Sequence, residues 1–349
     1  MKERIGVALS GGADSAVTAS LLISQGYDIF GLHMLLTNTP AAKTQAAHAA
    51  DLARQIGMEF SVLDATESFS SRVIAPFCNE YASGRTPNPC VICNREIKFG
   101  LLLRAAIDRG AEKLATGHYA RVVPHAPGHV LRRAVDNQAD QSYFLYAIDP
   151  AVLDRLVLPL GEVRRQEVRS IALQQGLVRG KSSQDICFLA GQNLPGFLAE
   201  RVRATPGDIV DLEGRVRGRH GGLSLCTVGQ RHGLGIALGE PAYVVRLDAR
   251  DNRVVIGTAD DLLSASARLQ HMRWLVQPEG GEFPAQARVR YRARCSAARV
   301  TLTETGAVVR FQEPQRAVAP GQSVVLYDAD TVLGGGVVAE TFARVHDAD

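Results

Sequence analysis

The sequence has no run of eighteen or more apolar residues, so it offers no segment able to cross a membrane as a helix. Its first apolar stretch begins at Ile5, which leaves no room for a signal peptide ahead of it. We therefore expect a cytoplasmic protein without a membrane partner. In that compartment the six cysteines are expected to stay reduced. A cysteine pair is then more typical of catalysis or metal binding than of a structural disulfide.

Lysine is scarce, because the 39 basic residues comprise five lysines and thirty-four arginines. The formal net charge of +3 neither demands nor excludes a nucleic-acid partner. The apolar share of 46% and the charged share of 21% are ordinary for a globular protein. A chain of 349 residues exceeds a typical single domain, which predicts two or three domains, each with its own core.

The Gly-Lys-Ser/Thr ending of the common nucleotide-binding P-loop is also absent. Instead, an apolar run from Ile5 leads into Ser10-Gly-Gly-Ala-Asp-Ser15, and a helical pattern follows over Ala16–Ile23. Backbone N–H groups at the glycines, two serine hydroxyls and the positive end of the helix dipole are suited to cradle a phosphate. Asp14 is placed to help hold a magnesium ion. The alternative is an ordinary turn between strand and helix.

The segments that follow alternate between strand and helix patterns. Strands are predicted at Asp28–Leu36, Glu59–Asp64 and Glu112–Ala115, helices at Lys43–Gly57 and Ser70–Ser83, and two further helices over Asp149–Gly176. Such alternation predicts an α/β domain with a doubly wound parallel sheet, whose ligand site lies outside the carboxyl ends of the strands.

Two cysteines stand in the segment Gly84-Arg-Thr-Pro-Asn-Pro-Cys-Val-Ile-Cys93, where the prolines favour an extended loop. Cys93 is predicted to open or precede a helix that runs to about Arg109, so that the helix dipole and Arg95 or Lys98 would favour its thiolate. A Cys-x-x-Cys pair also fits half a zinc site or a redox pair, but the partner pair of a zinc finger is missing. Cys187, in an apolar strand end, is by itself typical of a buried small residue.

Two further regions suit nucleic acid. His118 follows the strand ending at Ala115, either bonded to backbone or facing a nucleotide. The stretch Leu131–Tyr146 combines arginines, polar groups and two tyrosines, which suits the splayed bases of looped RNA or, alternatively, a solvated face beside core aromatics.

From Pro206 onward the turn signals recur at short intervals, which predicts all-β structure, including a hairpin of Ala242–Leu247 with Arg253–Gly257. A glycine-rich segment at Gln277–Gly281 marks a last all-β module. Within it, Arg288–Arg294 alternates strictly and predicts a strand with four guanidinium groups on one face. A phosphate backbone across them, or plain solvation of an edge strand, would relieve their repulsion.

These motifs, in this order, resemble those of the bacterial tRNA-specific 2-thiouridylases, members of the PP-loop ATP-pyrophosphatase superfamily. The matches cover almost the whole chain: Ser10–Ser15, Gly84–Phe99, Ala115–Arg121, Asp140–Tyr146, Ser183–Phe188, Gly229–Gly235 and Pro320–Gln322. The resemblance implies a catalytic domain over 1–203, a central β domain over 204–268 and a C-terminal β-barrel over 269–349. It also implies that ATP, with Mg²⁺, adenylates C2 of the wobble uridine 34 in tRNAs for lysine, glutamate and glutamine before sulfur replaces the oxygen.

The resemblance assigns roles to individual residues. Cys187 would carry a persulfide, loaded by a sulfur-relay protein or a cysteine desulfurase, and Cys93 would resolve it through a disulfide. Nucleotide contacts would fall on Ala8, Leu9, Ser10, Gly11, Gly12, Ala13, Asp14, Ser15, Met34 and Gly117. Contacts with the target base and the tRNA would fall on Asn88, Pro89, Cys90, His118, Asp140, Gln141, Arg290, Tyr291 and Gln322. No protein-held metal site is expected in this scheme.

Two departures from the family pattern leave alternatives open. Cys90 stands where many members carry aspartate, and the segment after Met34 lacks the usual acidic insert. Cys90, Cys93 and Cys187 could instead hold a [4Fe–4S] cluster with one iron open to sulfide. Another PP-loop synthetase or amidotransferase, or a non-catalytic RNA-binding protein, would explain fewer of the motifs.

Overall fold

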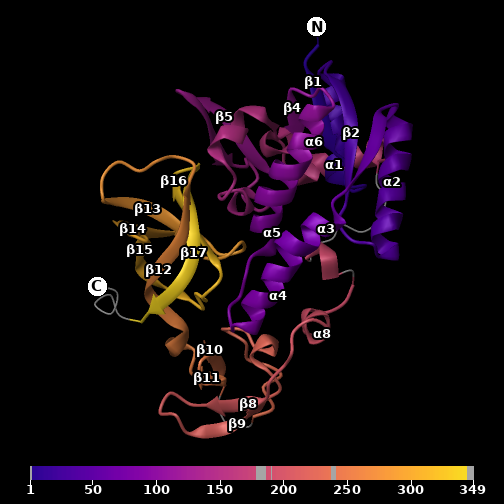
Figure 1. The fold of residues 1–349 in the computed structure, drawn as a ribbon. Coiled ribbons are helices and arrows are strands. Elements are labelled where there is room, and N and C mark those ends of the chain that lie inside the picture. Colours follow the sequence, from indigo (N-terminus) through magenta and orange to yellow (C-terminus); the bar gives the residue numbers. More distant parts are fainter. Residues whose placement is uncertain (1, 178–185, 190, 237–240, 344–349) are drawn as a thin grey trace.

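Short apolar strands separated by helices form a five-stranded parallel sheet in the order β3-β2-β1-β4-β7. The computed structural model describes residues 2–177, 186–189, 191–236 and 241–343, and shows this sheet at one end of the molecule (Figure 1). The strands are β1 Arg4–Ala8, β2 Asp28–Leu35, β3 Glu59–Asp64, β4 Lys113–Ala115 and β7 Leu156–Val157. The predicted doubly wound parallel sheet is confirmed.

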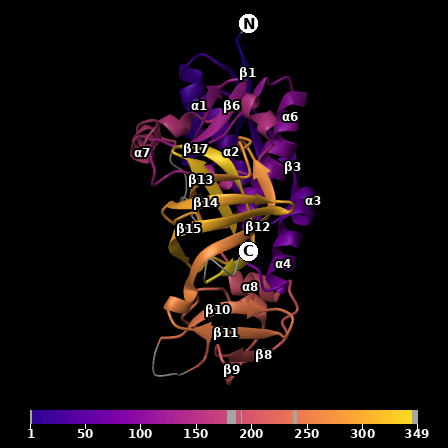
Figure 2. The ribbon, with the colours of Figure 1, turned by 90° about the vertical axis from the view of Figure 1, so that its left-hand side faces the viewer.

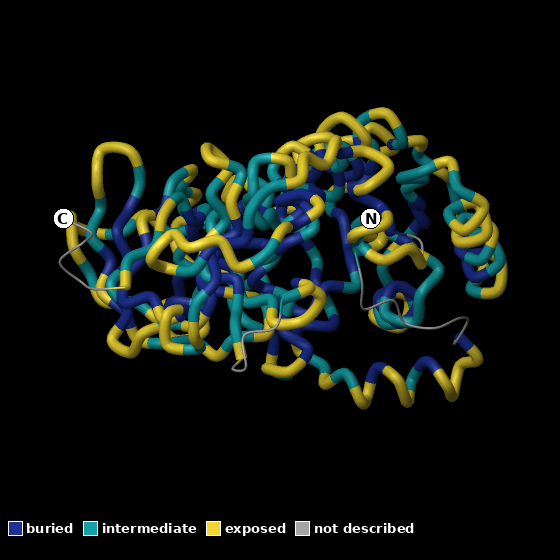
Figure 3. The backbone as a smooth tube through the Cα atoms, turned by 90° about the horizontal axis from the view of Figure 1, so that it is seen from below, coloured by how far each residue is buried: buried dark blue, intermediate teal, exposed yellow. Residues whose placement is uncertain are grey.

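Helices cover both faces of the sheet. On one face, α1 (Ala13–Ser24), α2 (Pro40–Ile56) and α7 (Arg165–Gln174) share a core with Ile5 and Val7 of β1. On the other face, α6 (Leu103–Asp108) and the preceding π-helical segment η2 (Cys93–Leu102) pack on strand β2. Buried residues lie toward the interior of the molecule, and exposed residues lie along its periphery (Figure 3).

Two helical arms extend from this sheet. The first runs through α3 (Thr66–Phe69), η1 (Ser70–Ile74) and α4 (Ala75–Ala82), so the helix predicted from Ser70 begins earlier. The second begins with α5 (Pro89–Ile92) and continues without a break into η2. Cys93 therefore lies one turn inside a helix and not at its start.

The two helices predicted over Asp149–Gly176 are only half present. The first is replaced by the 3-10 helix η4 (Pro150–Arg155), strand β7 and the 3-10 helix η5 (Pro159–Glu162). A strand of two residues is too short to produce a periodic signal, and Pro159 follows it almost at once. The second predicted helix is α7.

The central β domain lies at the opposite end of the molecule from the parallel sheet, as two perpendicular views show (Figures 1 and 2). Its strands are β8 (Gly207–Val210), β9 (Val216–His220), β10 (Tyr243–Asp248) and β11 (Arg253–Gly257), in the order β10-β11-β8-β9. The predicted hairpin is β10 and β11. Short helical segments precede and interrupt this domain: η6 Cys187–Leu189, α8 Leu194–Ala199 and η7 Leu223–Leu225.

Six strands close into the C-terminal barrel because β12 pairs with both β15 and β17. They are β12 Leu263–Trp274, β13 Glu282–Arg288, β14 Ser296–Thr303, β15 Gly306–Arg316, β16 Ser323–Asp328 and β17 Thr331–Phe342, with η8 Asp260–Leu262 ahead of them. A hairpin that follows β4 in the chain, β5 (Ala120–His125) and β6 (Gly128–Arg133), extends this sheet beyond β17. The barrel's first strand thus begins within the range expected for the central domain.

The strand predicted over Arg288–Arg294 is wrong. Strand β13 ends at Arg288, and residues 289–295 form the loop that leads to β14. The alternating pattern fails because the guanidinium of Arg288 donates to the backbone oxygens of Tyr291 and Ala293 and so turns the chain back. The four arginines therefore do not share one face of a strand.

No helix in the described ranges is long and apolar enough to cross a bilayer.

Candidate active site

The carboxyl ends of β1, β2 and β4 bring the predicted nucleotide residues to one edge of the sheet. Ala8 ends β1, Met34 lies next to the end of β2, and Gly117 follows β4. The edge is held by Leu9, whose N–H donates to the Leu32 oxygen at 2.8 Å. This is the position at which open parallel sheets bind ligands.

The Ser10–Ser15 loop is held by hydrogen bonds between its serine hydroxyls and its own backbone. Ser15 Oγ accepts from the Ser10 N–H at 3.1 Å and donates to the Gly12 oxygen at 2.9 Å. The Gly12 N–H reaches Ser10 Oγ at 3.3 Å. Gly11 adopts φ +82°, which a side chain would strain, and Gly12 is the N-cap of α1. The loop therefore has a fixed shape before any anion arrives.

Gly117 lies directly against the start of α1. A Cβ at this position would stand 3.1 Å from both Asp14 C and Ser15 N. The loop after β4 and the Ser10–Ser15 loop therefore form one continuous wall, and this close approach explains why a glycine stands there.

Tyr119 is a residue that the motif analysis did not assign. Its hydroxyl donates to Asp14 Oδ1 at 2.9 Å, while its ring is fully buried beneath the guanidinium of Arg165 at 5.2 Å. Burial, then the negative charge of Asp14, raises the pKa of Tyr119, so the hydroxyl stays a donor. Tyr119 thus orients the carboxylate expected to serve magnesium. Its place next to His118 was the only signal available.

The three predicted cysteines are brought together by helix packing. Cys93 belongs to a core cluster with Phe77 and Phe188. The Phe188 ring stands edge-on to Phe77 at 5.2 Å, and this contact anchors the turn that carries Cys187. Cys187 is exposed and Cys93 is buried. Of the matched Ser183–Phe188 motif, residues 183–185 lie outside the described residues, and Cys187 opens a 3-10 turn instead of ending a strand.

The expectation of a favoured thiolate at Cys93 is wrong for this structure. Burial raises the pKa of Cys93 to about 12, and the positive charge of Lys98 offsets only part of that effect. Burial likewise raises the pKa of Cys90, and the protein packed around the Cys187 sulfur raises its pKa as well, although the residue keeps an exposed surface. The helix dipole does not help Cys93, because the helix begins four residues before it.

The half-buried Lys98 and the buried His118 form a polar pair, and the charge of Lys98 acts on the cysteines. The Lys98 ammonium lies 3.2 Å from His118 Nε2, and Thr116 Oγ1 lies 2.7 Å from His118 Nδ1. Burial, followed by the charge of Lys98, holds the pKa of His118 well below its ordinary value. The ring is therefore neutral, accepting at Nε2 from Lys98 and donating at Nδ1 to Thr116. The contacts of His118 that the structure shows are thus to two side chains, not to the backbone as in one predicted option, and a role toward the nucleotide or the tRNA stays a prediction.

The other predicted base-binding residues line the same region. Asn88 Nδ2 donates to the Tyr143 hydroxyl at 3.0 Å, and Pro89 opens α5 just before Cys90. Gln141 is half-buried, and its Oε1 accepts from the Tyr119 N–H at 3.1 Å.

Tyr143 and Tyr146, in the stretch predicted to suit RNA stacking, are both buried. They belong to a core cluster, as the alternative interpretation of this stretch predicts, and are not free to stack on RNA bases.

The barrel contributes two loops to this region. The Thr86 N–H donates to the Pro320 oxygen at 2.8 Å, which sets Gln322 near the cysteine segment. The Gln322 Oε1 atom is buried and has no hydrogen-bond partner among the described residues. In the other loop, the Tyr291 ring lies 4.4 Å from Phe144, and Arg290 is exposed.

Asp140 does not lie where direct contact with tRNA is possible. Its side chain is 1% exposed and is taken up by an ion pair with Arg288 at 2.9 Å. It also accepts from the N–H groups of Ala134 and Ser142. The expectation of direct contact is therefore replaced by an internal role.

Within the described residues, no group of three or more His, Cys, Asp or Glu side chains is arranged to hold a metal ion. Cys93 lies close enough to Cys90 and Cys187 to interact with them electrostatically, but the three thiols are not arranged as a metal site. The geometry gives the iron–sulfur alternative no support, and we derive no step through a cluster.

Family models match three consecutive parts of the chain. A "tRNA methyl transferase HUP domain" matches residues 3–191, a "tRNA methyl transferase PRC-barrel domain" residues 195–258, and an "Aminomethyltransferase beta-barrel domain" residues 264–338. Together these matches follow the sheet, the central domain and the barrel described above.

Curated relatives match over their full length. A tRNA-specific 2-thiouridylase of Syntrophotalea carbinolica is 45% identical over 97% of this chain and 100% of its own length. That of Pelobacter propionicus is 43% identical over 99% and 100%. A solved U34-tRNA thiolase of Methanococcus maripaludis, with its [4Fe-4S] cluster, has a TM-score of 0.37 at 17% identity over 57% of this chain and 64% of its own. A likeness that distant does not bear on the chemistry of this site.

Proposed function

The chain belongs to the family of tRNA-specific 2-thiouridylases, and from this premise we propose how its own residues carry out the reaction. It is an ATP-using tRNA-uridine 2-sulfurtransferase, which replaces the C2 oxygen of a tRNA uridine by sulfur to give 2-thiouridine. The observation that carries the proposal is a preformed anion loop at the carboxyl edge of the sheet, together with a buried and an exposed cysteine in helical segments whose core cluster packs against Met34 of β2.

The first half of the reaction is activation by ATP. The backbone and hydroxyls of Ser10–Ser15 would hold the phosphates at the N-terminus of α1, with Ala8, Leu9, Met34 and Gly117 along the nucleotide. Attack of the uridine C2 oxygen on the α-phosphorus would release pyrophosphate and leave AMP on that oxygen. Mg²⁺ would neutralise phosphate charge there. The structural support is Asp14, which Tyr119 holds in place.

The second half is sulfur transfer. The exposed Cys187 would receive a persulfide from a sulfur-relay protein or cysteine desulfurase, and its outer sulfur would attack C2 as AMP leaves. The Cys93 thiolate would then attack Cys187 Sγ, breaking the S–S bond to the transferred sulfur and forming a Cys93–Cys187 disulfide. A two-electron thiol reductant would restore both thiols. Exposure of one sulfur to a donor, with the second sulfur shielded, supports this division.

The proposed substrate is the wobble uridine 34 of tRNAs for lysine, glutamate and glutamine, in the cytoplasm, where both thiols are reduced. A loop base is inexpensive to extrude from its stack. Asn88, Pro89, Cys90 and His118 would contact the target base, and Gln141, Arg290, Tyr291 and Gln322 would contact the tRNA around it.

The test is thiolation of unmodified lysine tRNA with ATP by protein purified without air, after its visible spectrum is recorded. We expect colourless protein, release of AMP and pyrophosphate only with tRNA, loss of activity in Cys93→Ala and Cys187→Ala, and retained activity in Cys90→Ala. A brown protein that needs all three cysteines would replace the persulfide scheme by the iron–sulfur one. AMP release with another acceptor but not with tRNA would indicate a different PP-loop synthetase or amidotransferase.

A further inference from the structure

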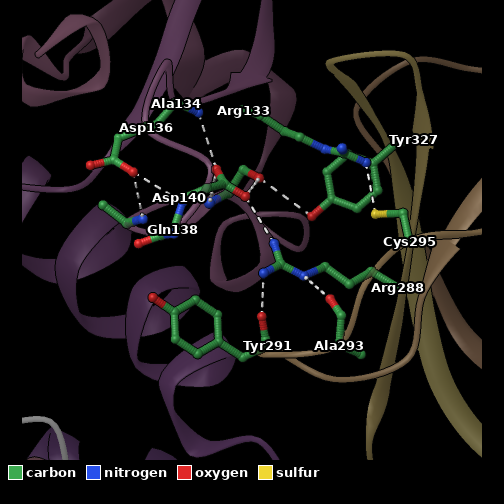
Figure 4. Close-up of polar contacts among 12 residues, drawn as sticks. Arg133, Ala134, Asp136, Gln138, Asp140, Arg288, Tyr291, Ala293, Cys295 and Tyr327 are labelled. Atoms are coloured by element: carbon green, nitrogen blue, oxygen red, sulfur yellow. Dashed lines mark hydrogen bonds and ion pairs between the residues drawn. The ribbon is translucent and has the colours of Figure 1, made fainter. Parts of the chain in front are cut away.

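The most deeply buried ion pair among the described residues joins two domains. Arg288, at the end of barrel strand β13, and Asp140, in the catalytic domain, meet at 2.9 Å with side chains 12% and 1% exposed (Figure 4). The carboxylate is further held by the N–H groups of Ala134 at 3.1 Å and Ser142 at 3.2 Å, and by Ser142 Oγ at 3.0 Å. Asp140 is therefore fully occupied inside the protein.

All three guanidinium nitrogens of Arg288 donate hydrogen bonds. While one nitrogen pairs with Asp140, Nε donates to the Ala293 oxygen at 3.2 Å and Nη2 donates to the Tyr291 oxygen (Figure 4). Both acceptors belong to the loop 289–295. The guanidinium also lies 5.5 Å from the Tyr291 ring and 5.9 Å from the Tyr143 ring. One side chain thus fixes the loop's backbone, its aromatic residue and its distance from the catalytic domain.

The loop so fixed carries the exposed basic groups of this region. Arg290, Arg292 and Arg294 are exposed. The side chain of Arg288, in contrast, is largely buried. Exposed arginines on a shaped loop suit a phosphate backbone. The loop therefore turns three arginines outward and one inward, although all four share one phase of the alternating sequence.

On its other side the ion pair is tied to the nucleotide loop. Asp140 is followed by Gln141, which exchanges two hydrogen bonds with Tyr119: the Gln141 N–H donates at 2.7 Å and Gln141 Oε1 accepts at 3.1 Å. Tyr119 in turn bonds Asp14 at 2.9 Å. A short path of hydrogen bonds thus leads from the arginine loop to the loop that would hold ATP.

We infer that Arg288 and Asp140 are positioning residues that fix loop 289–295 relative to the Ser10–Ser15 loop, and that neither touches the tRNA. The inference rests on the proposed function, since it concerns delivery of the tRNA to that site. Misplacement of a substrate by about 1 Å can cost about a hundredfold in rate. The pair's effect is therefore expected in turnover more than in binding of the nucleotide.

The decisive comparison is Arg288→Lys with Arg288→Gln. Lysine keeps the positive charge and would preserve most of a direct phosphate contact, but it cannot reach one carboxylate and two carbonyl oxygens at once. We expect both variants to lose about a hundredfold in kcat/KM for tRNA, mostly in kcat, with the KM for ATP unchanged. Asp140→Asn is expected to show the same split. An Arg288→Lys enzyme close to wild type would overturn the inference.

Arg290→Gln is the matched control from the same loop. It is expected to lower the slope of log Kd for tRNA against log salt by about 0.7. Arg288→Lys, which keeps its charge, is expected to leave that slope unchanged. If Arg288→Gln lowered the slope and Arg288→Lys kept the wild-type slope, Arg288 would instead be a direct contact to the tRNA.

A measurement on the wild-type protein keeps the inference open to refutation even if these variants do not fold. Phenylglyoxal, followed by peptide mass spectrometry, should modify Arg290 and Arg294 in the free protein and spare them when tRNA is bound. Arg288 should stay unmodified in both states. Modification of Arg288 that tRNA prevents would overturn the inference. Absence of thiolation by the wild-type protein would instead refute the proposed function.

Discussion

Cys93 in the resting protein should be an unreactive thiol, in spite of its proposed catalytic role. Its pKa lies near 12 against an ordinary value of 9.0, because burial outweighs the attraction of Lys98. Three units lower the thiolate fraction at pH 8 about a thousandfold, and only the thiolate reacts with alkylating reagents. Cys187 keeps an exposed surface and should be alkylated before the buried Cys93, although its own pKa is raised too.

The assay is iodoacetamide labelling of the reduced protein at pH 8, quenched at intervals and resolved by peptide mass spectrometry. The free-thiol reference is the same peptide after unfolding in guanidinium. We expect Cys93 to react at least about a hundredfold more slowly than in the unfolded chain, because only its thiolate reacts. A rate within a few-fold of the unfolded reference would refute the reasoning, since burial would then not control the thiol.

The same shift has a consequence for stability. A thiol with a raised pKa in the folded state favours folding while it stays protonated, so this contribution is complete below about pH 9. It is lost as the pH rises from 9 toward 12. Removing the titrating group in Cys93→Ala should flatten the fall in free energy of unfolding across that interval, as measured by denaturant titration at each pH.

Gly117→Ala would place a Cβ 3.1 Å from the backbone of Asp14, so ATP affinity should fall about tenfold by calorimetry, roughly 1.4 kcal/mol. Gly281→Ala is its control, because a Cβ there meets no atom of the described residues within 4 Å, and equal affinities would contradict the proposed wall. Tyr119→Phe removes the hydroxyl bonded to Asp14, worth about 1 kcal/mol, and should raise the KM for ATP about fivefold; an unchanged KM would leave Tyr119 without an orienting role. Gly161→Ala would bring a Cβ to 1.9 Å from a backbone oxygen of β5, so the melting temperature should fall by at least about 5 °C in calorimetric scans, and an unchanged value would show that the chain yields there.

Local chemistry was sufficient to predict the parallel sheet and the alternation of strands and helices from β1 to β3, but not β7 or the β5–β6 hairpin. Short apolar strands such as β1 and β2 are buried on both faces, and helices such as α2 carry clear ends: Thr39 accepts from the Ala42 N–H, and Gly57 closes the helix at φ +74°. These signals lie within a few residues of one another. They can therefore be recognised in the sequence without knowledge of tertiary contacts.

The errors arose where distant residues decide. The sequence around Cys93 indicates neighbouring positive charge, yet the cluster that buries the thiol includes Phe188, almost a hundred positions later. Arg288 shows the alternation of a strand, but its partner Asp140 is 148 positions away. Electrostatic effects on a side chain depend on what surrounds it, and no local pattern contains that information.

The pairing of β17 with β6 also constrains how the protein is made. Thr331 lies opposite Arg132, so about two hundred residues must leave the ribosome before the edge of the β5–β6 hairpin finds its partner. At about 5–20 residues per second, that edge stays open for roughly 10–40 s during synthesis. An open strand edge invites pairing with other chains. Truncations that remove β17 should therefore leave a nascent product that aggregates through this hairpin, although every residue expected to bind ATP is already in place.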